Sequence, residues 1–515
     1  MTTPSSTPDP RRWLVLCFIA LAQLMVVLDG TVINIALPHA QEDLHFSDDS
    51  RQWIITAYAL SFGSLLLLGG RISDKFGRRK SLMIGLIGFA TASAIGGASV
   101  NFEMLVGARA LQGAFGAILA PAALSLITVI FTEGKERAKA FGIYGGISGT
   151  GAAVGLLLGG ALTEYLDWRA TMYVNVIFAV VTVSGAIWII REPAGKKDTN
   201  PIDIPGVLLV AGGLASIVYG LGRASNDGWS NPVTIAMMVG GLLLLVVFVL
   251  VENRVSHPLL PMRVPRNRNR GGAYLTLGLA VIGMYGVFLF MTFYLQTIRG
   301  YSPMMAGVAF LPMVFGMLGG STQIAARLTP YVPPRLLMGP GLLVAATGML
   351  ILTRIGLESD YWTTVAPGMF LLGLGLGTTF MTATSLATVG IESEDAGVAS
   401  AMVNTSQQIG GAIGTALLNT IATGTTAAYI ASHAINKTAP DARSLEERLE
   451  LQGTVDGFVR GTWWGVAFLL SSAVIAVTMI NRGKLSQDKP AASTSSSAAP
   501  ALDGDDDDLL ERTPV

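Results

Sequence analysis

The sequence predicts an all-α polytopic membrane protein with fourteen transmembrane helices. Of its 515 residues 51% are hydrophobic and only 13% are charged, whereas a soluble chain is about a quarter charged. The 61 glycines are typical of helices that pack closely in a bilayer. Apolar stretches of about 20 residues, long enough to cross the hydrocarbon core, recur along the whole chain.

Fourteen stretches satisfy this length rule. They lie at 13–38, 52–70, 81–100, 104–130, 138–163, 170–190, 204–224, 232–252, 272–298, 303–327, 335–355, 361–390, 397–423 and 461–481. The first follows Arg11 and Arg12 directly and is too long for the apolar part of a signal peptide, so we expect it to remain as a span.

The loop charges predict the orientation. If the N-terminus is cytoplasmic, most Lys and Arg fall on the inside, above all in 71–80 and 254–270. This positive-inside pattern places both termini in the cytoplasm and requires an even number of spans. The bias toward Arg over Lys suggests a bacterial genome, so we expect a multi-pass protein of a bacterial inner membrane.

Four segments outside the spans depart from the regular pattern. The basic loop 253–271 separates the first eight spans from the last six. The outside segment 424–460 contains the charged run 443–450, which predicts a short surface helix. The inside loop 391–395 is acidic, against the charge rule. The C-terminal segment 483–515 is rich in Ser, Ala and Pro and then acidic, which predicts a disordered cytoplasmic tail.

The first apolar stretch ends with the segment Leu28–Pro38. Asp29, in this segment, is the only acid of the stretch. A charged carboxylate inside a membrane-spanning segment costs several kcal/mol, on the order of 3 or more, and such residues are usually functional. We therefore treat Asp29 as a candidate proton carrier.

The loop between spans 2 and 3 carries glycines for a tight turn and an acid that can bind an arginine or a helix N-terminus. Its sequence, Gly70 to Lys80, resembles the signature cytoplasmic loop of the major facilitator superfamily. The resemblance implies that the loop locks the cytoplasmic side when the transporter faces outward. The residues that match are Gly70, Asp74, Gly77, Arg78 and Arg79.

In span 4, Arg109, Gln112, Gly113 and Gly116 share one helix face. Arg109 lies near the outer end, so its side chain has the alternative of extending to the membrane surface. The pattern is similar to the family's span-4 motif, whose arginine is implicated in proton coupling. The resemblance makes Arg109 the expected partner of Asp29.

Span 5 has a column of glycines, Gly151, Gly155 and Gly159, which predicts close helix packing. The spacing of Gly142, Gly151, Gly155, Gly159 and Gly160 also resembles the antiporter motif of proton-driven exporters. The family has a proline after the third of these glycines, where this chain has Leu156. Its absence weakens the inference to strict antiport, and a similar loss occurs in the EfpA branch, for which lipid-like substrates are considered.

The stretch Leu28–Pro38 is similar to the span-1 motif of the fourteen-span drug/proton antiporter branch, the EmrB/QacA type. The resemblance implies the major facilitator fold, two six-helix bundles that rock about a site near the midplane. We expect a cytoplasmic N-terminal tail, an N-terminal bundle, two inserted helices, a C-terminal bundle and the acidic tail. Their ranges are 1–12, 13–192, 203–254, 271–482 and 483–515.

The expected function is proton-coupled export of multiple drugs, antibiotics or secondary metabolites, with the proton gradient as energy source and no cofactor. Polar residues expected to line the substrate cavity are Asn34, Gln112, Asn404, Gln407 and Gln408; the last three share one face, and hydrogen bonding between helices is the alternative. Transport of lipids or lipid-like molecules and proton-coupled import remain open.

The composition limits the kinds of partner that the protein is expected to bind. The net charge is zero, so nothing indicates nucleic acid. The four histidines lie in or beside loops, no metal-ligand spacing or nucleotide-binding loop is present, and Cys17 is the single cysteine, so we expect neither an enzyme nor a metal site. The expected partners are a small amphipathic substrate, protons and the lipid bilayer, and the expected oligomeric state is a monomer.

Overall fold

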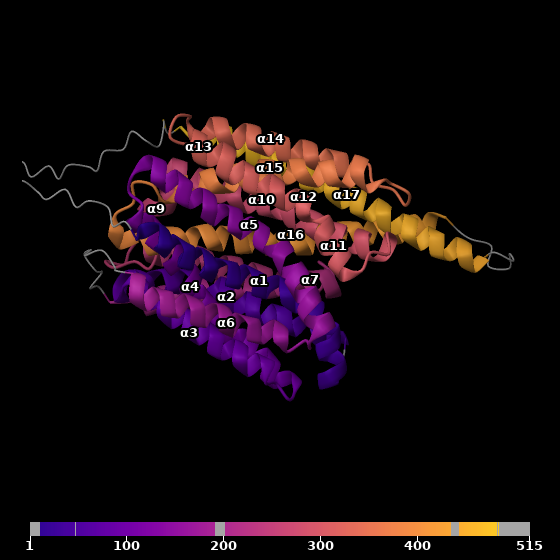
Figure 1. Ribbon diagram of the computed structural model, residues 1–515, viewed down its shortest axis with the longest axis horizontal. Coiled ribbons are helices and arrows are strands. Elements are labelled where there is room, and N and C mark those ends of the chain that lie inside the picture. Colours follow the sequence, from indigo (N-terminus) through magenta and orange to yellow (C-terminus); the bar gives the residue numbers. More distant parts are fainter. Residues whose placement is uncertain (1–10, 47, 191–200, 434–441, 482, 484–515) are drawn as a thin grey trace, which may run out of the picture.

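The computed structural model describes residues 11–46, 48–190, 201–433, 442–481 and 483, which form helices and connecting segments without a strand (Figure 1). The helices of the first half are α1 (Arg12–Leu44), α2 (Asp48–Phe76), α3 (Arg78–Gly97), α4 (Phe102–Ile130), α5 (Gly134–Tyr165), α6 (Ala170–Ile189), α7 (Ile204–Asp227) and α8 (Pro232–Glu252).

The second half begins with the short α9 (Arg263–Arg266) and contains longer helices interrupted by π-helical turns. These are α10 (Arg268–Phe293) with η1 (Tyr294–Ile298), α11 (Pro303–Ala309), α12 (Leu311–Leu318), η2 (Gly319–Ala325), α13 (Ala326–Leu328), α14 (Pro334–Leu352), η3 (Tyr361–Val365), α15 (Ala366–Thr388), the 3-10 turn η4 (Ser393–Asp395), α16 (Ala396–Ser432) and α17 (Ala442–Met479).

The all-α polytopic fold is confirmed, and all fourteen predicted ranges are essentially helical. Among the residues that the structure describes, twelve helical segments are long and apolar enough to cross a membrane. The remaining two predicted spans are α5, several of whose side chains lie outside the described residues, and α16, whose Asn, Gln, Ser and Thr residues make it less apolar. Both lie between the two halves of the molecule: α5 packs on α1 and on α11, α12 and α15, and α16 packs on α10 and α17 as well as on α2 and α4. Most of the described glycines of the two helices are buried in these contacts.

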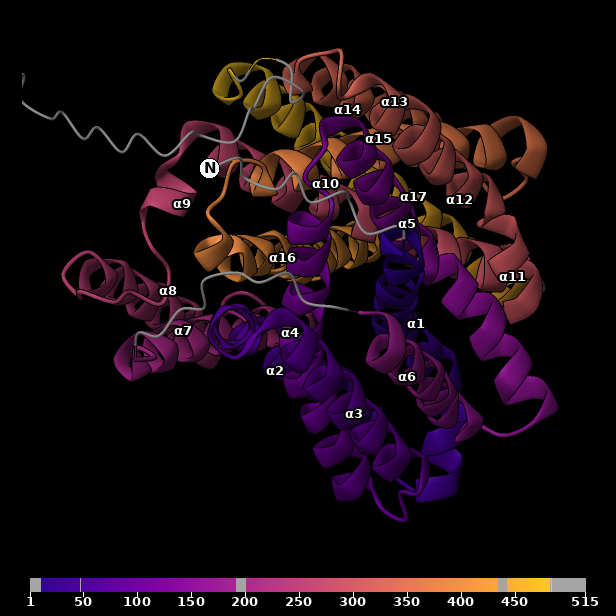
Figure 2. The same cartoon turned by 60° about the vertical axis from the view of Figure 1, so that its left-hand side comes forward.

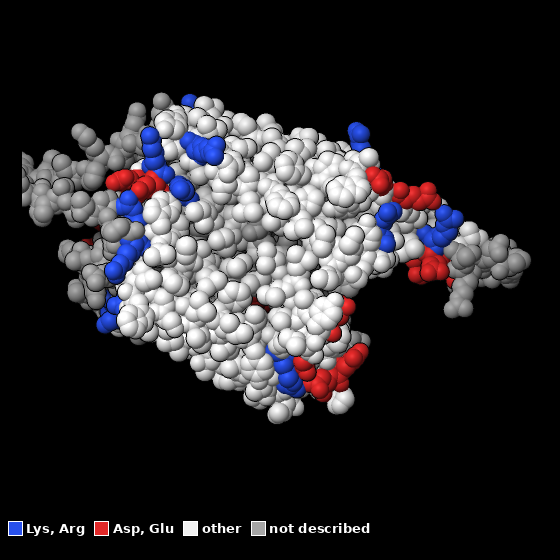
Figure 3. Space-filling model, in the orientation of Figure 1, with Lys and Arg blue, Asp and Glu red and all other residues white. Residues whose placement is uncertain are grey.

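Helices α7 and α8, by contrast, are strongly apolar and little covered by protein. They form a hairpin whose α7 packs on α2 and α16, at one side of the molecule (Figure 2). Only 17% of the most apolar stretch of α8 is buried inside the protein. In the space-filling view, Lys, Arg, Asp and Glu gather at the two ends of the molecule, and the band between them is almost uncharged (Figure 3). This is the distribution that a bilayer requires.

The prediction of a separate short helix at 443–450 was wrong. Residues 443–450 are helical, but they are the first turns of the 38-residue α17 rather than a separate surface helix. α16 likewise continues past 423 to Ser432, and Thr426 Oγ1 donates to Gly453 O across the pair at 3.0 Å. Packing of the two extensions on each other replaces the predicted loop. The predicted tail 483–515, apart from residue 483, and residues 1–10 of the N-terminal tail lie outside the described residues.

Candidate functional site

The centre of the site is the carboxylate of Asp29, on α1, which is only 1% exposed. Arg109 Nη1, from α4, donates to Asp29 Oδ2 at 2.6 Å. Gln112 Nε2, also from α4, and Asn175 Nδ2, from α6, donate to Asp29 Oδ1 at 2.9 and 2.7 Å. Three donors from two helices therefore surround the charged form of this acid.

Ser93, on α3, completes the network. Its Oγ accepts from Gln112 Nε2 at 2.8 Å and from Asn175 Nδ2 at 2.9 Å, and it donates to Met172 O at 3.0 Å. Arg109 Nη1 also donates to Gln112 Oε1 at 2.8 Å. Both amides are thereby held in one orientation, with their hydrogens directed at Asp29 and Ser93.

Arg109 is 1% exposed, and its guanidinium lies over the Tyr58 ring with 4.4 Å to the ring centroid. The alternative in which this side chain extends to the membrane surface is therefore not the one adopted. Removing one member of a buried ion pair leaves an uncompensated charge and costs about 3–5 kcal/mol. Protonation of Asp29 would remove the negative charge that pairs with Arg109, so binding of a proton can change the packing of these helices.

Asp29, Arg109 and Gln112 are predicted from the sequence, whereas Asn175, Ser93 and Tyr58 are not. Asn175 is the single Asn in the predicted span 170–190, and an amide in an apolar span indicates a hydrogen bond to another helix. In the structure its Oδ1 is buried and has no partner. Ser93 carries no such signal. Gln112 was expected to line a substrate cavity, but its amide is used within the network.

The glycine column of α5 packs on the part of α1 that carries Asp29. A Cβ added at Gly151 would lie 2.7 Å from Val27 Cγ1, and one at Gly155 would lie 1.9 Å from Thr31 Oγ1. At Gly159 the nearest atom is Val32 Cα, at 3.1 Å. The absence of side chains thus allows α5 to approach α1 on both sides of Asp29. The helix is continuous through Leu156, whose side chain lies outside the described residues.

Two other motif glycines face the second half of the molecule. A Cβ at Gly142 would lie 2.8 Å from Ala326 Cβ, and one at Gly160 would lie 3.8 Å from Met304 N. α5 therefore contacts the helix of Asp29 on one face and helices of the second half of the chain on the other.

The predicted cytoplasmic loop joins the two halves through Asp74. Its Oδ1 accepts from Gly397 N at 2.9 Å, and its Oδ2 accepts from Val398 N at 3.2 Å. These amides are at the N-terminus of α16, where a negative charge is stabilised by the helix dipole and by unpaired N–H groups. Arg78 Nη2 donates to the same carboxylate at 3.2 Å.

Glycines permit this contact. A Cβ at Gly70 would lie 2.7 Å from Gly397 O, and one at Gly397 would lie 2.4 Å from Gly70 O. Gly77 has φ +98°, a conformation that L side chains rarely adopt. Arg79 differs from the others because it donates to Ile187 O at 3.0 Å, at the end of α6 and within the N-terminal half.

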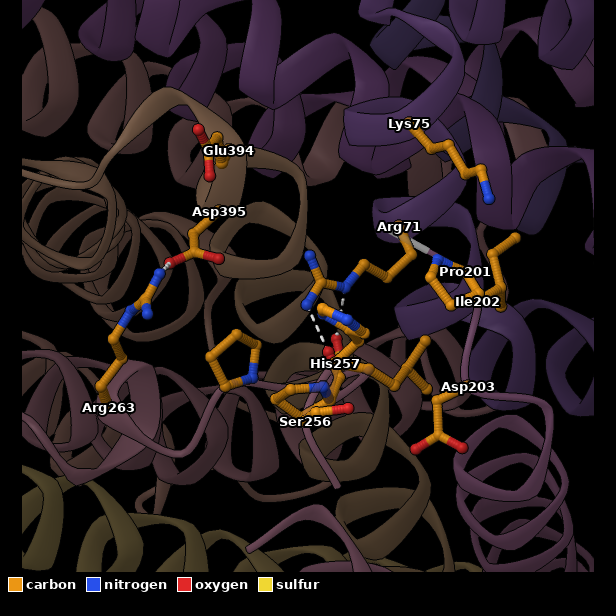
Figure 4. A pocket seen from close by; sticks show the side chains of 13 residues that line it. Arg71, Lys75, Pro201, Ile202, Asp203, Ser256, His257, Arg263, Glu394 and Asp395 are labelled. Atoms are coloured by element: carbon orange, nitrogen blue, oxygen red, sulfur yellow. Dashed lines mark hydrogen bonds and ion pairs between the residues drawn. The ribbon is translucent and has the colours of Figure 1, made fainter. Parts of the chain in front are cut away.

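Further contacts close the same end. Arg137 Nη2, on α5, donates to Thr388 Oγ1, on α15, at 2.9 Å. Arg71 donates through Nε to Leu259 O at 2.9 Å and through Nη2 to Pro258 O, in the segment between α8 and α9 (Figure 4). Arg263 Nη2 lies 2.6 Å from Asp395 Oδ2. The acidic loop 391–395, which is an exception to the positive-inside pattern, therefore forms an ion pair with the basic segment 254–270.

The remaining predicted residues are less connected. Asn404 is buried and donates to Ser400 O of its own helix at 3.0 Å, and Gln407 and Gln408 are half-buried. The side chain of Asn34 lies outside the described residues. Within the part of the chain that the structure describes, no group of three or more His, Cys, Asp or Glu is placed to hold a metal ion.

Comparison with known proteins gives the same architecture. The family profile described as "Major Facilitator Superfamily" matches residues 19–415. The chain is 50% identical to "Puromycin resistance protein pur8" of Streptomyces alboniger, over 96% of both chains.

It is 34% identical to "Cephamycin export protein CmcT" of Amycolatopsis lactamdurans (80% and 86% covered) and 35% identical to "Multidrug efflux pump LfrA" of Mycolicibacterium smegmatis (82% and 83%). The crystal structure of the human organic anion transporter MFSD10 aligns with 91% of this chain and 100% of its own, with a TM-score of 0.61 at 14% identity. At that identity the likeness concerns the fold alone.

Proposed function

The chain belongs to the Major Facilitator Superfamily, and we propose that it is a proton-coupled exporter of antibiotics or related secondary metabolites. As a member of this family it is a multi-pass membrane transporter of small molecules rather than an enzyme. Export of a drug-like cargo is supported by the names of its relatives, which include puromycin resistance, cephamycin export and multidrug efflux proteins.

The observation that carries the coupling proposal is the buried ion pair of Asp29 and Arg109. Asp29 takes up a proton from outside, which neutralises the carboxylate and breaks its pairing with Arg109. The glycine column of α5 contacts α1 around this residue, and the opposite face of α5 contacts the C-terminal bundle. A rearrangement at Asp29 is therefore passed directly to the interface about which the two bundles rock.

The cytoplasmic contacts supply the other half of the cycle. Asp74 against the N-terminus of α16, and Arg137 against Thr388, hold the cytoplasmic ends together. These contacts keep the cytoplasmic side closed while the cargo leaves on the outside. Release of the Asp29 proton to the cytoplasm accompanies their separation and the binding of new cargo.

The proposed setting is the inner membrane of a bacterium, with both termini in the cytoplasm. The basic residues at 71–80 and 254–270 support this orientation. The protein works as a monomer on the energy of the proton gradient and needs no cofactor. The bundles are 13–192 and 271–482, and 203–254 is the inserted pair; the packing of α7 on α2 and α16, outside either set, supports this division.

The test is transport by the purified protein in inside-out liposomes with an acidic lumen. Puromycin is the first cargo to assay, because the Streptomyces alboniger relative covers 96% of this chain. Puromycin should accumulate in the lumen as protons leave, and an uncoupler should stop it. Loss of cargo from the lumen would instead indicate import, and translocation of a fluorescent lipid without drug uptake would indicate the lipid-like cargo class.

A further inference from the structure

The hairpin of α7 and α8 ends in two acids that lie together. Asp203 caps α7, and its Oδ1 accepts from Gly206 N at 3.0 Å. Glu252 is the last residue of α8, and its Oε2 accepts from Leu260 N at 3.0 Å. The second oxygen of each, Asp203 Oδ2 and Glu252 Oε1, is buried and has no hydrogen-bond partner. The whole Glu252 residue is only 3% exposed.

These two unpaired oxygens lie beside the same glycine, Gly206, and the two carboxyl groups are within hydrogen-bond reach of each other. A Cβ placed on this glycine would lie 2.6 Å from Asp203 Oδ2 and 2.5 Å from Glu252 Oε1. Two carboxylates so close repel each other, and each would lack a donor. A protonated carboxyl group has one O–H donor, so a single proton between the two groups satisfies both orphan oxygens at once.

We propose that Asp203 and Glu252 share one proton and form a second proton site, separate from Asp29, that holds the inserted hairpin against the cytoplasmic gate. This site goes beyond the proposed export function, because it is on the inserted helices and would exist whatever the cargo is.

Glu252 and Arg71 of the cytoplasmic loop bind consecutive residues of one segment. Glu252 holds Leu260 N–H, and the carbonyls of the two preceding residues, Pro258 and Leu259, receive Arg71 from the cytoplasmic loop (Figure 4). Loss of the shared proton leaves two facing negative charges. When these charges separate, the segment between α8 and α9 moves, and with it the two carbonyl oxygens that accept hydrogen bonds from Arg71.

The surroundings favour a proton over a metal ion. Arg71 and Lys75 of α2, His257, Arg263 of α9, and Glu394 and Asp395 of η4 line one pocket together with Asp203 (Figure 4). None of them donates to the two orphan oxygens, and α16, which also packs on α7, has no acidic or basic residue. Two carboxylates beside three or four cationic groups make a poor cation site, but they can hold one proton.

Infrared spectroscopy of the full-length protein in nanodiscs tests the site directly. Asp29→Asn serves as the background, so that the first proton site is silent. A C=O band of a protonated carboxyl group should titrate with pH in this background and disappear in Asp29→Asn/Glu252→Gln. The amide of Gln donates to Asp203 as the proton would, so the fold is kept. Asp203→Asn should have the same effect, and Glu447→Gln, at an exposed position, should have none.

Hydrogen exchange of residues 253–262 tests the link to the gate. After correction for intrinsic rates, protection of this segment should fall as pH rises in the wild type and should be independent of pH in Glu252→Gln. Spectra that are identical with and without Glu252 would overturn the proposal. Protection that depends on added Na⁺ or Mg²⁺ instead of pH would also overturn it, because the pair would then bind a cation.

Discussion

Arg109 Nη1 lies 2.6 Å from Asp29 Oδ2, and both side chains are almost completely buried. Each residue neutralises a charge that the interior would otherwise hold alone. The contact therefore contributes to stability and to the proposed coupling at the same time, and the two contributions can be separated by mutation.

Asp29→Asn should abolish pH-driven accumulation of cargo while the protein still inserts in the membrane. Asparagine carries no proton between the two sides, and its amide nitrogen replaces an oxygen that accepts from Arg109, Gln112 or Asn175. The measurement is cargo uptake under an imposed pH gradient, normalised to inserted protein. Asp43→Asn is the matched control, because Asp43 is on the same helix but pairs with Arg169 at the surface. Full uptake by Asp29→Asn would refute the assignment.

The energetics of the pair should be strongly non-additive. Arg109→Gln alone should destabilise the protein by about 3–5 kcal/mol, because it leaves the carboxylate buried without its cation. Asp29→Asn/Arg109→Gln should cost less than the sum of the two single changes. Thermal unfolding of the four proteins in detergent at one pH measures this coupling. Additive effects would mean that the two charges do not depend on each other.

The sequence predicted this pair because both residues are ionisable, both lie within apolar spans, and their motifs have known partners. It could not predict Ser93, since serine is common in membrane helices and only the fold brings it between Gln112 and Asn175. Asn175 is intermediate: an amide in an apolar span indicates a hydrogen bond, but not with which residue.

Gly155→Ala should weaken transport and stability, because the new methyl group would overlap Thr31 Oγ1 and push α5 away from α1. Overpacking of this kind typically costs about 1–3 kcal/mol. Thr31→Ala removes the overlapping atom, so Gly155→Ala/Thr31→Ala should recover much of the loss. Gly107→Ala, where nothing lies within 4 Å of the new Cβ, is the control for a change of glycine as such. The readouts are uptake and thermal stability; absence of rescue by Thr31→Ala would argue against direct contact.

Gly397→Ala should open the cytoplasmic side. Its Cβ would meet Gly70 O at 2.4 Å and Asp74 Oδ2 at 2.7 Å, so the N-terminus of α16 must move away from Asp74. In a Cys17→Ser background, spin labels at Lys80→Cys and Arg335→Cys, both exposed, should report longer distances than in the parent.

Gly424→Ala, near the other end of the same helix, has no atom within 4 Å of the new Cβ and should leave the distance distribution unchanged. An unchanged distribution for Gly397→Ala would mean that the contact with Asp74 does not hold the gate.

The gate shows where prediction from sequence ends. Gly70, Asp74 and Gly77 were recognisable from the motif, and Gly77 does take the positive φ that a turn requires. Their partner is the start of α16, more than 300 residues away, which is marked only by the acidic loop 391–395. The same limit applies to Asp203 and Glu252, which the hairpin brings together, and to 443–450, whose charges indicate exposure but not continuity with α17.

α16 is one helix of 37 residues, about 55 Å long at 1.5 Å per residue, whereas the hydrocarbon core is about 30 Å thick. Its first amides bind Asp74 at the end of the molecule that we propose to be cytoplasmic, and its last turns pair with the start of α17 at the other end. A rod of this length tilts as a lever, so that opening the gate displaces its outer end in the opposite direction. An antibody fragment that grips the outer end would therefore trap one access state without touching the transport path.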